Sequence, residues 1–300
     1  MLTYVLLFSV SLLTAFFNLL VVISISHFKH LHTPTNLLLL SLGVSDFFIS
    51  FLILCQIVLI DGCWFLGDLM CALYQYLAAI ITAVSVETMV LISVDRYVAI
   101  CDPLHYRTKI TQTKVKICVC LCWFGSVMYA SLNLKDNMKQ PGRYNSCFGE
   151  CVFVINFIAG IVDTIIFFII PITVIIILYM RVFVVAVSQA RVLRSHVAAV
   201  SLQCSMKVKA QKSELKAART LGVVVVVFLI CLCPYYCAAL TAHDSQMNAS
   251  SAAFVICLYY FNSCLNPLIY ACFYPWFRKS VRLIITLKIL QSDSCEALVS

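Results

Sequence analysis

The chain alternates long apolar stretches with short polar connections. Seven apolar stretches, each about 20 residues or longer, are long enough to cross a bilayer as helices. They lack the short alternation of apolar and polar positions that transmembrane β-strands show. The pattern therefore predicts an all-α membrane protein, a seven-transmembrane helix bundle. The stretches lie roughly at 3–26, 36–60, 70–99, 114–133, 156–187, 214–242 and 252–272.

Composition and charge agree with this class and predict an orientation. Hydrophobic residues are 63% of the 300 positions and charged residues 11%, against about 25% charged in a soluble domain. Of the 21 Lys and Arg residues, only Lys135, Lys139 and Arg143 lie between the fourth and fifth stretches. Basic loops face the cytoplasm, so we expect an extracellular N-terminus and a cytoplasmic C-terminus. The net charge of +8 is then explained by basic loops that lie at the surface of the lipid bilayer. No nucleic-acid partner is expected.

Five polar residues fall near the middle of the apolar stretches: Asp46, Ser85, Asn262, Ser263 and Asn266. A carboxylate in contact with lipid is costly, so Asp46 is expected to face the bundle interior. Oxygen ligands around one carboxylate suit a small, hard cation. Two interpretations stay open: an ion site, or a hydrogen-bonded network with water and no ion.

Asp163 is the chief candidate for ligand binding. It lies about two helical turns before Pro171, and no basic residue lies in the apolar interiors to pair with it. An organic cation would supply the missing charge. The alternative is a protonated aspartate that hydrogen-bonds neighbours such as Thr164. Four tyrosines on the sixth and seventh stretches would add cation–π attraction, or serve only in packing: Tyr235, Tyr236, Tyr259 and Tyr260.

Sequence motifs connect this pattern to a known family. The last stretch contains Asn266-Pro267-Leu268-Ile269-Tyr270, and the chain continues with Tyr274-Pro275-Trp276-Phe277-Arg278-Lys279. The third stretch closes with Asp95-Arg96-Tyr97, and the sixth contains Pro234. In this order, these features resemble the rhodopsin-like G-protein-coupled receptors. The longer phrase from Tyr274 narrows the resemblance to the trace amine-associated receptors.

The resemblance implies a plasma-membrane receptor that binds a small amine and signals through a heterotrimeric G protein of the stimulatory or olfactory type to cAMP. It implies a disulfide between Cys71 and Cys151, and an allosteric sodium ion at the polar residues around Asp46. It also implies an amphipathic eighth helix at about 275–290, before a cytoplasmic tail at 291–300. Residues with a role in activation and G-protein coupling would be Asp95, Arg96, Tyr97, Pro103, Leu104, Tyr179, Glu214, Phe228, Pro234, Pro267 and Tyr270.

Departures from the family pattern leave alternatives open. Ala78 stands where amine receptors keep the aspartate that binds the ammonium group, and Leu232 replaces an aromatic linked to activation. Some fish-type members of the family are described as using a fifth-span aspartate instead, which matches Asp163. The alternatives are a receptor for a non-amine ligand and, from the acids Asp46, Glu87 and Asp163, an ion channel or transporter. We expect no enzyme, because no nucleophile–base pair or metal motif of useful spacing occurs.

Overall fold

The computed structural model describes residues 2–60, 64–142, 145, 150–151, 157–197, 222–238 and 249–291. Its long helices are α1 (Leu2–His27), α2 (Pro34–Ile60), α3 (Asp68–Cys101), α5 (Gln112–Asn133), α8 (Ile170–Val197) and α10 (Ala249–Phe273). The helix Gly222–Ala238 is shorter. The remaining elements are η1 (Lys29–Leu31), α4 (Tyr106–Lys109), α6 (Lys135–Lys139), α7 (Phe157–Thr164), η2 (Ile165–Ile169), α11 (Pro275–Ile285) and η4 (Lys288–Leu290).

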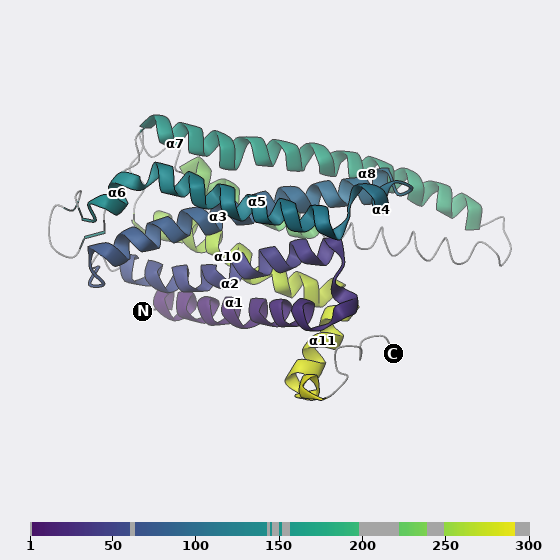
Figure 1. The fold of residues 1–300 in the computed structure, drawn as a ribbon, viewed down its shortest axis with the longest axis horizontal. Coiled ribbons are helices and arrows are strands. Elements are labelled where there is room, and N and C mark those ends of the chain that lie inside the picture. Colours follow the sequence, from purple (N-terminus) through teal and green to yellow (C-terminus); the bar gives the residue numbers. More distant parts are fainter. Residues whose placement is uncertain are drawn as a thin grey trace.

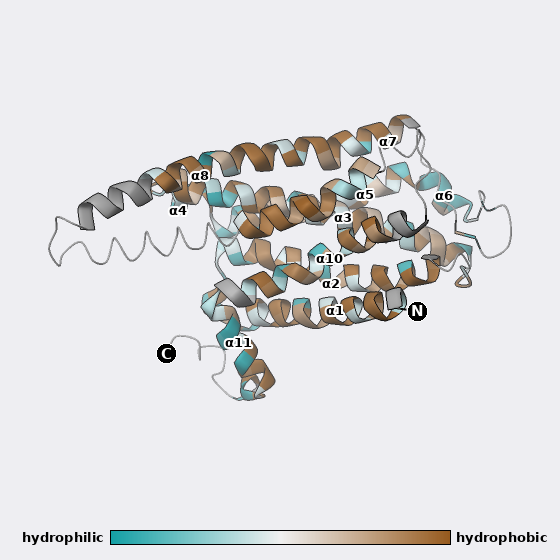
Figure 2. Ribbon diagram, turned by 180° about the vertical axis from the view of Figure 1, so that it is seen from behind, coloured by the Kyte–Doolittle hydropathy of each residue, from teal (hydrophilic) through white to brown (hydrophobic). Residues whose placement is uncertain are grey.

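The long helices lie side by side as one elongated bundle (Figure 1). Five helices in the described part are long and apolar enough to cross a membrane, or six if the bent pair α10 and α11 counts as one span. The ribbon is predominantly hydrophobic along the bundle (Figure 2). No strand occurs among the described residues. The predicted all-α membrane class is confirmed.

Helix α3 occupies the centre of the bundle and connects its two ends. It packs against α2, α5 and α8, and its side chains Val84, Met89 and Ile92 are fully buried. Cys71 lies in its first turn and Arg96 in its last turns. We call the two ends of the bundle the disulfide end and the Arg96 end.

A disulfide joins Cys71 to Cys151, as the family resemblance implied. It ties the connection that precedes α7 to the start of the central helix. The bond therefore fixes Cys151 beside the first turn of α3.

Irregular backbone shapes the fifth and seventh helices. The segment η2 is one π-helical turn between α7 and α8, an irregularity that occurs mostly as a single turn inside an α-helix. Pro267 lies inside α10. After Tyr274 the chain turns, and α11 begins at Pro275 and lies at 94° to α10. Glu214 and the rest of residues 198–221 lie outside the described residues.

Candidate functional site

A cavity of about 320 Å³ opens between α2, α3, α5, α7, η2, the helix Gly222–Ala238 and α10. Six residues that the sequence analysis singled out line it: Ala78, Asp163, Tyr235, Tyr236, Tyr259 and Tyr260. Thr164, which was also predicted, is not among the lining residues, and its hydroxyl donates to the Gly160 carbonyl at 2.9 Å. The structure thus brings the predicted ligand residues of four helices to one cavity.

Asp163 is the one carboxylate among the described residues that line the cavity, and these include no Lys or Arg. Its Oδ1 accepts a hydrogen bond from the Tyr129 hydroxyl at 3.2 Å. The Tyr129 ring packs edge-on against Phe167, with ring centroids 4.9 Å apart. None of the ion pairs found in the described part of the chain includes Asp163. This acid therefore faces the cavity with a neutral partner and no counter-charge.

Tyrosines form much of the remaining cavity wall. Tyr235 packs against Tyr259 at a centroid distance of 4.8 Å, and the Tyr259 hydroxyl donates to Thr82 Oγ1 at 2.7 Å. At the far side, the Tyr74 hydroxyl donates to Gln56 at 2.8 Å and lies 3.3 Å from the Tyr260 hydroxyl. These bonds hold the phenol groups in place, so the aromatic wall is preorganised.

A second group of polar residues lies buried between α2, α3 and α10. Asp46 Oδ2 accepts a hydrogen bond from Asn266 Nδ2 at 2.8 Å, and Ser263 is a second partner of the same carboxylate. Ser85 donates to Ser45 at 2.9 Å. Three buried oxygens here have no hydrogen-bond partner: Asp46 Oδ1, Asn262 Oδ1 and Asn266 Oδ1. Unpartnered hard oxygens around one carboxylate fit a small cation or water.

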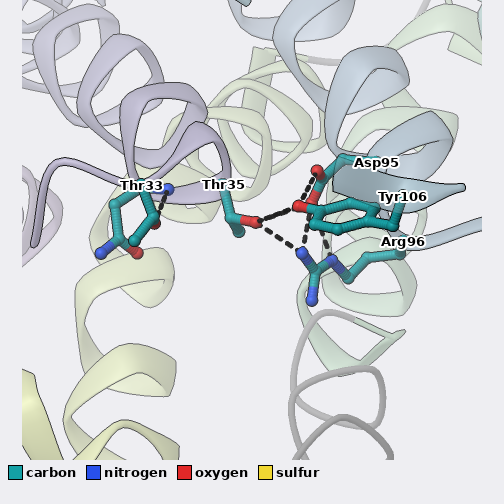
Figure 3. Close-up of polar contacts among 6 residues, drawn as sticks. Thr33, Thr35, Asp95, Arg96 and Tyr106 are labelled. Atoms are coloured by element: carbon teal, nitrogen blue, oxygen red, sulfur yellow. Dashed lines mark hydrogen bonds and ion pairs between the residues drawn. The ribbon is translucent and has the colours of Figure 1, made fainter. Parts of the chain in front are cut away.

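At the Arg96 end, a polar network surrounds the Asp95 carboxylate (Figure 3). The Arg96 guanidinium pairs with Asp95 Oδ2 and also donates to the Thr35 hydroxyl. The Thr35 hydroxyl donates to Oδ2 at 2.9 Å, and the Tyr106 hydroxyl donates to Oδ1 at 2.8 Å. Every donor in this network comes from a different element: α2, α3 or α4.

The loop that follows α3 holds two groups with shifted pKa values. Burial, together with the nearby Asp95 charge, raises the pKa of Tyr106 to about 12, so its hydroxyl stays a proton donor. Hydrogen bonds from Lys109 and His105 lower the pKa of the partly exposed Asp102 carboxyl to about 2. Asp102 is thus ionised at neutral pH and links the end of α3 to α4 through Lys109.

The other residues predicted to act in activation differ in their environments. Phe228 and Tyr270 are buried, and the hydroxyls of Tyr179 and Tyr270 have no hydrogen-bond partner. Tyr97 packs against Ile100 and Val182. Leu104 is 89% exposed beside Pro103, in the turn between α3 and α4. Pro234 lies within the helix Gly222–Ala238 and Pro267 within α10.

Among the residues with direct contacts that were not sequence candidates, three donate to the carboxylates of Asp95 and Asp163: Thr35, Tyr106 and Tyr129. Each is a common polar residue near the end of a helix, and its partner lies on another helix. Thr35 and Tyr106 are 71 positions apart in the sequence, and Tyr129 and Asp163 are 34 apart. No local spacing marks such pairs. Only the packing of α2, α4 and α5 around the central helix reveals them.

Comparisons with known proteins identify the family. The model of the 7 transmembrane receptor (rhodopsin family) matches residues 17–270. Trace amine-associated receptor 8a of Rattus norvegicus is 39% identical over 291 residues, which cover 92% of this chain and 84% of that receptor. Trace amine-associated receptor 4 of Mus musculus is 35% identical over 301 residues (97% and 87%), and receptor 1 of Mus musculus is 36% identical over 287 residues (92% and 86%). With its apolar helix bundle and its Cys71–Cys151 disulfide, this chain belongs to the trace amine-associated receptors, a family of multi-pass plasma-membrane receptors within the rhodopsin family.

Proposed function

We propose that the receptor binds a small amine in the 320 Å³ cavity, with the Asp163 carboxylate as the partner of the ammonium group. The observation that carries this proposal is the position of Asp163. It faces the cavity without a basic partner, and the α3 residue Ala78, which lines the same cavity, offers no charge. The names of the related receptors also point to amines.

The physical case rests on the energy of a desolvated charge. An ionised carboxylate away from water is costly unless it is paired, and an ammonium ligand removes that cost. Six tyrosines line the same cavity, and each aromatic face near the cation adds ~0.5–2 kcal/mol. A neutral ligand would leave Asp163 unpaired, so a receptor for a non-amine ligand is the less favoured function.

For signalling, we propose that ligand binding shifts the receptor from an inactive to an active packing. The Asp95–Arg96 pair belongs to the inactive packing, and its release opens the Arg96 end to a heterotrimeric G protein of the stimulatory or olfactory type, with cAMP as the product. This end faces the cytoplasm, because the basic loops cluster there. A channel or transporter would not need this arrangement, and the absence of current under voltage clamp would exclude one.

We also propose that a sodium ion binds at Asp46 and modulates amine affinity. Asp46, Asn262 and Asn266 would supply the oxygens, since each has one buried oxygen without a partner. A bound sodium ion would neutralise the Asp46 charge and hold α2 against α10. Ser263 and, through Ser45, Ser85 complete the surrounding polar cluster.

The variant Asp163→Asn tests the amine proposal. Removing one partner of a buried charge pair costs ~3–5 kcal/mol, or several hundred-fold or more in affinity. We expect every amine agonist to lose potency by that amount in a cAMP reporter assay at matched surface density. A neutral analogue with the shape of the best agonist should not activate the parent receptor. Amine potency within a few-fold of the parent would refute the anchor role and favour a non-amine ligand.

Moving the acid provides the complementary test. The double variant Ala78→Asp with Asp163→Ala places one carboxylate on the α3 wall of the same cavity. It should recover binding of some amines that Asp163→Ala alone has lost, with a different size preference. If the double variant folds and reaches the surface but binds no amine of any size, the other residues that line this cavity do not form the amine site.

A further inference from the structure

A second cavity lies far from the ligand site, at the Arg96 end of the bundle. It is a groove of about 370 Å³ between α1, α10 and α11. Its walls are apolar: Phe17 and Leu20 from α1, Leu268 from α10, and Val281 and Ile285 from α11. The guanidinium groups of Arg278 and Arg282 are the charged groups among its lining residues.

The walls of the groove are fixed by anchored side chains. Helix α11 leaves the bundle at a steep angle and packs against α1 and α10 (Figure 1). Phe277 is 2% exposed in the core, and the buried Ser280 hydroxyl donates to the Trp276 carbonyl at 2.9 Å. Leu268 and Ile285, by contrast, are 38% and 64% exposed. The groove thus has an exposed apolar surface beside the buried side chains that pack α11 against the bundle.

The charges of α11 gather beside this apolar surface. Figure 2 shows both hydrophilic and hydrophobic ribbon on α11. Arg278 and Arg282 are exposed and lie four residues apart. Side chains at this spacing are neighbours on one helix face, about 5–6 Å apart at Cβ. Two guanidinium groups at that separation can both reach the oxygens of a single phosphate.

From this geometry we infer that the groove is a binding site for one acidic glycerophospholipid. One acyl chain lies against Phe17, Leu20 and Leu268, and the phosphate and the headgroup carboxylate lie on Arg278 and Arg282. The occupant is a membrane lipid because the apolar walls continue from the membrane-spanning helices α1 and α10. The site is separate from the amine cavity, with which it shares no residue.

The charge of the headgroup decides which lipid binds. The acyl chain gains little on entering the groove, because the bilayer interior is already as apolar as a leucine side chain. The two arginines supply the preference, since each basic residue near the surface improves the binding of an acidic lipid by about fivefold. A zwitterionic lipid or a sterol would meet the same walls and gain no such preference.

The experiment counts retained lipid. The full-length receptor is reconstituted in nanodiscs with phosphatidylserine and phosphatidylcholine of identical acyl chains, released into mild detergent and measured by native mass spectrometry. The parent should retain one phosphatidylserine in preference to phosphatidylcholine. Arg282→Gln should lower this preference by about fivefold, and Arg278→Gln with Arg282→Gln by about 25-fold. Leu268→Trp, which fills the groove and keeps both charges, should also displace the lipid.

Lys279→Gln is the matched control. Lys279 lies on the same helix and carries the same charge, but it does not line the groove. Its variant should retain phosphatidylserine as the parent does. If Lys279→Gln and Arg282→Gln lower the retention of phosphatidylserine equally, the lipid is held by diffuse attraction to the basic surface and not by a site. That result would overturn the proposal. Equal retention of phosphatidylcholine, or full retention by the double arginine variant, would overturn it as well. Unchanged thermal unfolding of the surface variants verifies that each is folded.

Discussion

Two carboxylates in this receptor occupy contrasting environments. Asp95, at the Arg96 end, is 2% exposed and receives hydrogen bonds from Arg96, Thr35 and Tyr106. Asp163, at the ligand cavity, has one neutral partner in the described structure, the Tyr129 hydroxyl at 3.2 Å. One acid is surrounded by donors and a counter-charge, and the other faces an open space.

The difference separates a structural charge from a binding charge. A buried acid with a complete set of partners stabilises one packing of its helices, and breaking the set favours another packing. A partly buried acid beside a cavity keeps the free energy of pairing available to a ligand. In the proposed function, the two ends of the bundle use the same chemical group for different purposes, and the central helix α3 connects them.

The largest effect is expected when the counter-charge of Asp95 is removed. Arg96→Ala should reduce agonist-stimulated cAMP to the level of cells without receptor, because the proposed G-protein contact is lost. Ligand binding should stay within a few-fold of the parent, since Arg96 does not line the cavity. The measurement is a cAMP reporter assay together with radioligand binding at equal surface density.

Lys116→Ala is the control for this variant, because Lys116 is an exposed basic residue of α5 near the same end. It should signal normally. Normal cAMP output from Arg96→Ala would remove the distinction between the two carboxylates, because the paired acid would then have no role in activation.

Asp46 provides an intermediate case, with one oxygen paired and one unpartnered. We expect amine affinity to fall by about 5–150-fold when sodium replaces a bulky cation at constant ionic strength, the usual range of coupling between two sites. Asp46→Asn should abolish this dependence, because the proposed ion site loses its charge. Radioligand competition in the two salts measures both effects. A flat response in the parent receptor would leave Asp46 as a member of a hydrogen-bonded network without an ion.

Sequence reasoning predicted the helix bundle and the Cys71–Cys151 disulfide, because long apolar stretches and a family motif are local signals. It also selected Asp163, since an acid in an apolar stretch stands out by itself. It also grouped Arg96 with Asp95, and Ser263 and Asn266 with Asp46, but it did not predict the other partners of Asp95 or the partner of Asp163. Thr35, Tyr106 and Tyr129 are ordinary residues whose importance arises from helix packing, and the groove beside α11 depends on the turn after Tyr274.

The partners found only in the structure lead to smaller predictions. Tyr106→Phe removes one donor to Asp95 and leaves Arg96 and Thr35 in place. A hydrogen bond to a charged group contributes ~1.5–3 kcal/mol, so ligand-free cAMP should rise by at least about tenfold if the bond belongs to the inactive packing. The assay is basal cAMP at matched surface density. Unchanged basal output would mean that the Tyr106 bond is equally strong in both packings.

The smallest effect is expected for the single partner of Asp163. Tyr129→Phe keeps the ring contact with Phe167 and removes only the hydroxyl that donates to the carboxylate. A net contribution of ~0.5–1.5 kcal/mol predicts a loss of amine affinity of about fivefold, because the carboxylate is less well oriented toward the cavity.

A matched control and a double variant distinguish this orienting role from a general effect on packing. Tyr76→Phe removes a comparable hydroxyl, which bonds Ser131 of α5 from α3 at 2.8 Å, and Tyr76 does not line the cavity. It should leave amine affinity unchanged. Tyr129→Phe should add nothing to Asp163→Asn, since residues that act through one another have non-additive effects. If the two losses add in full, Tyr129 contacts the ligand directly, and Asp163 faces the cavity without an orienting partner.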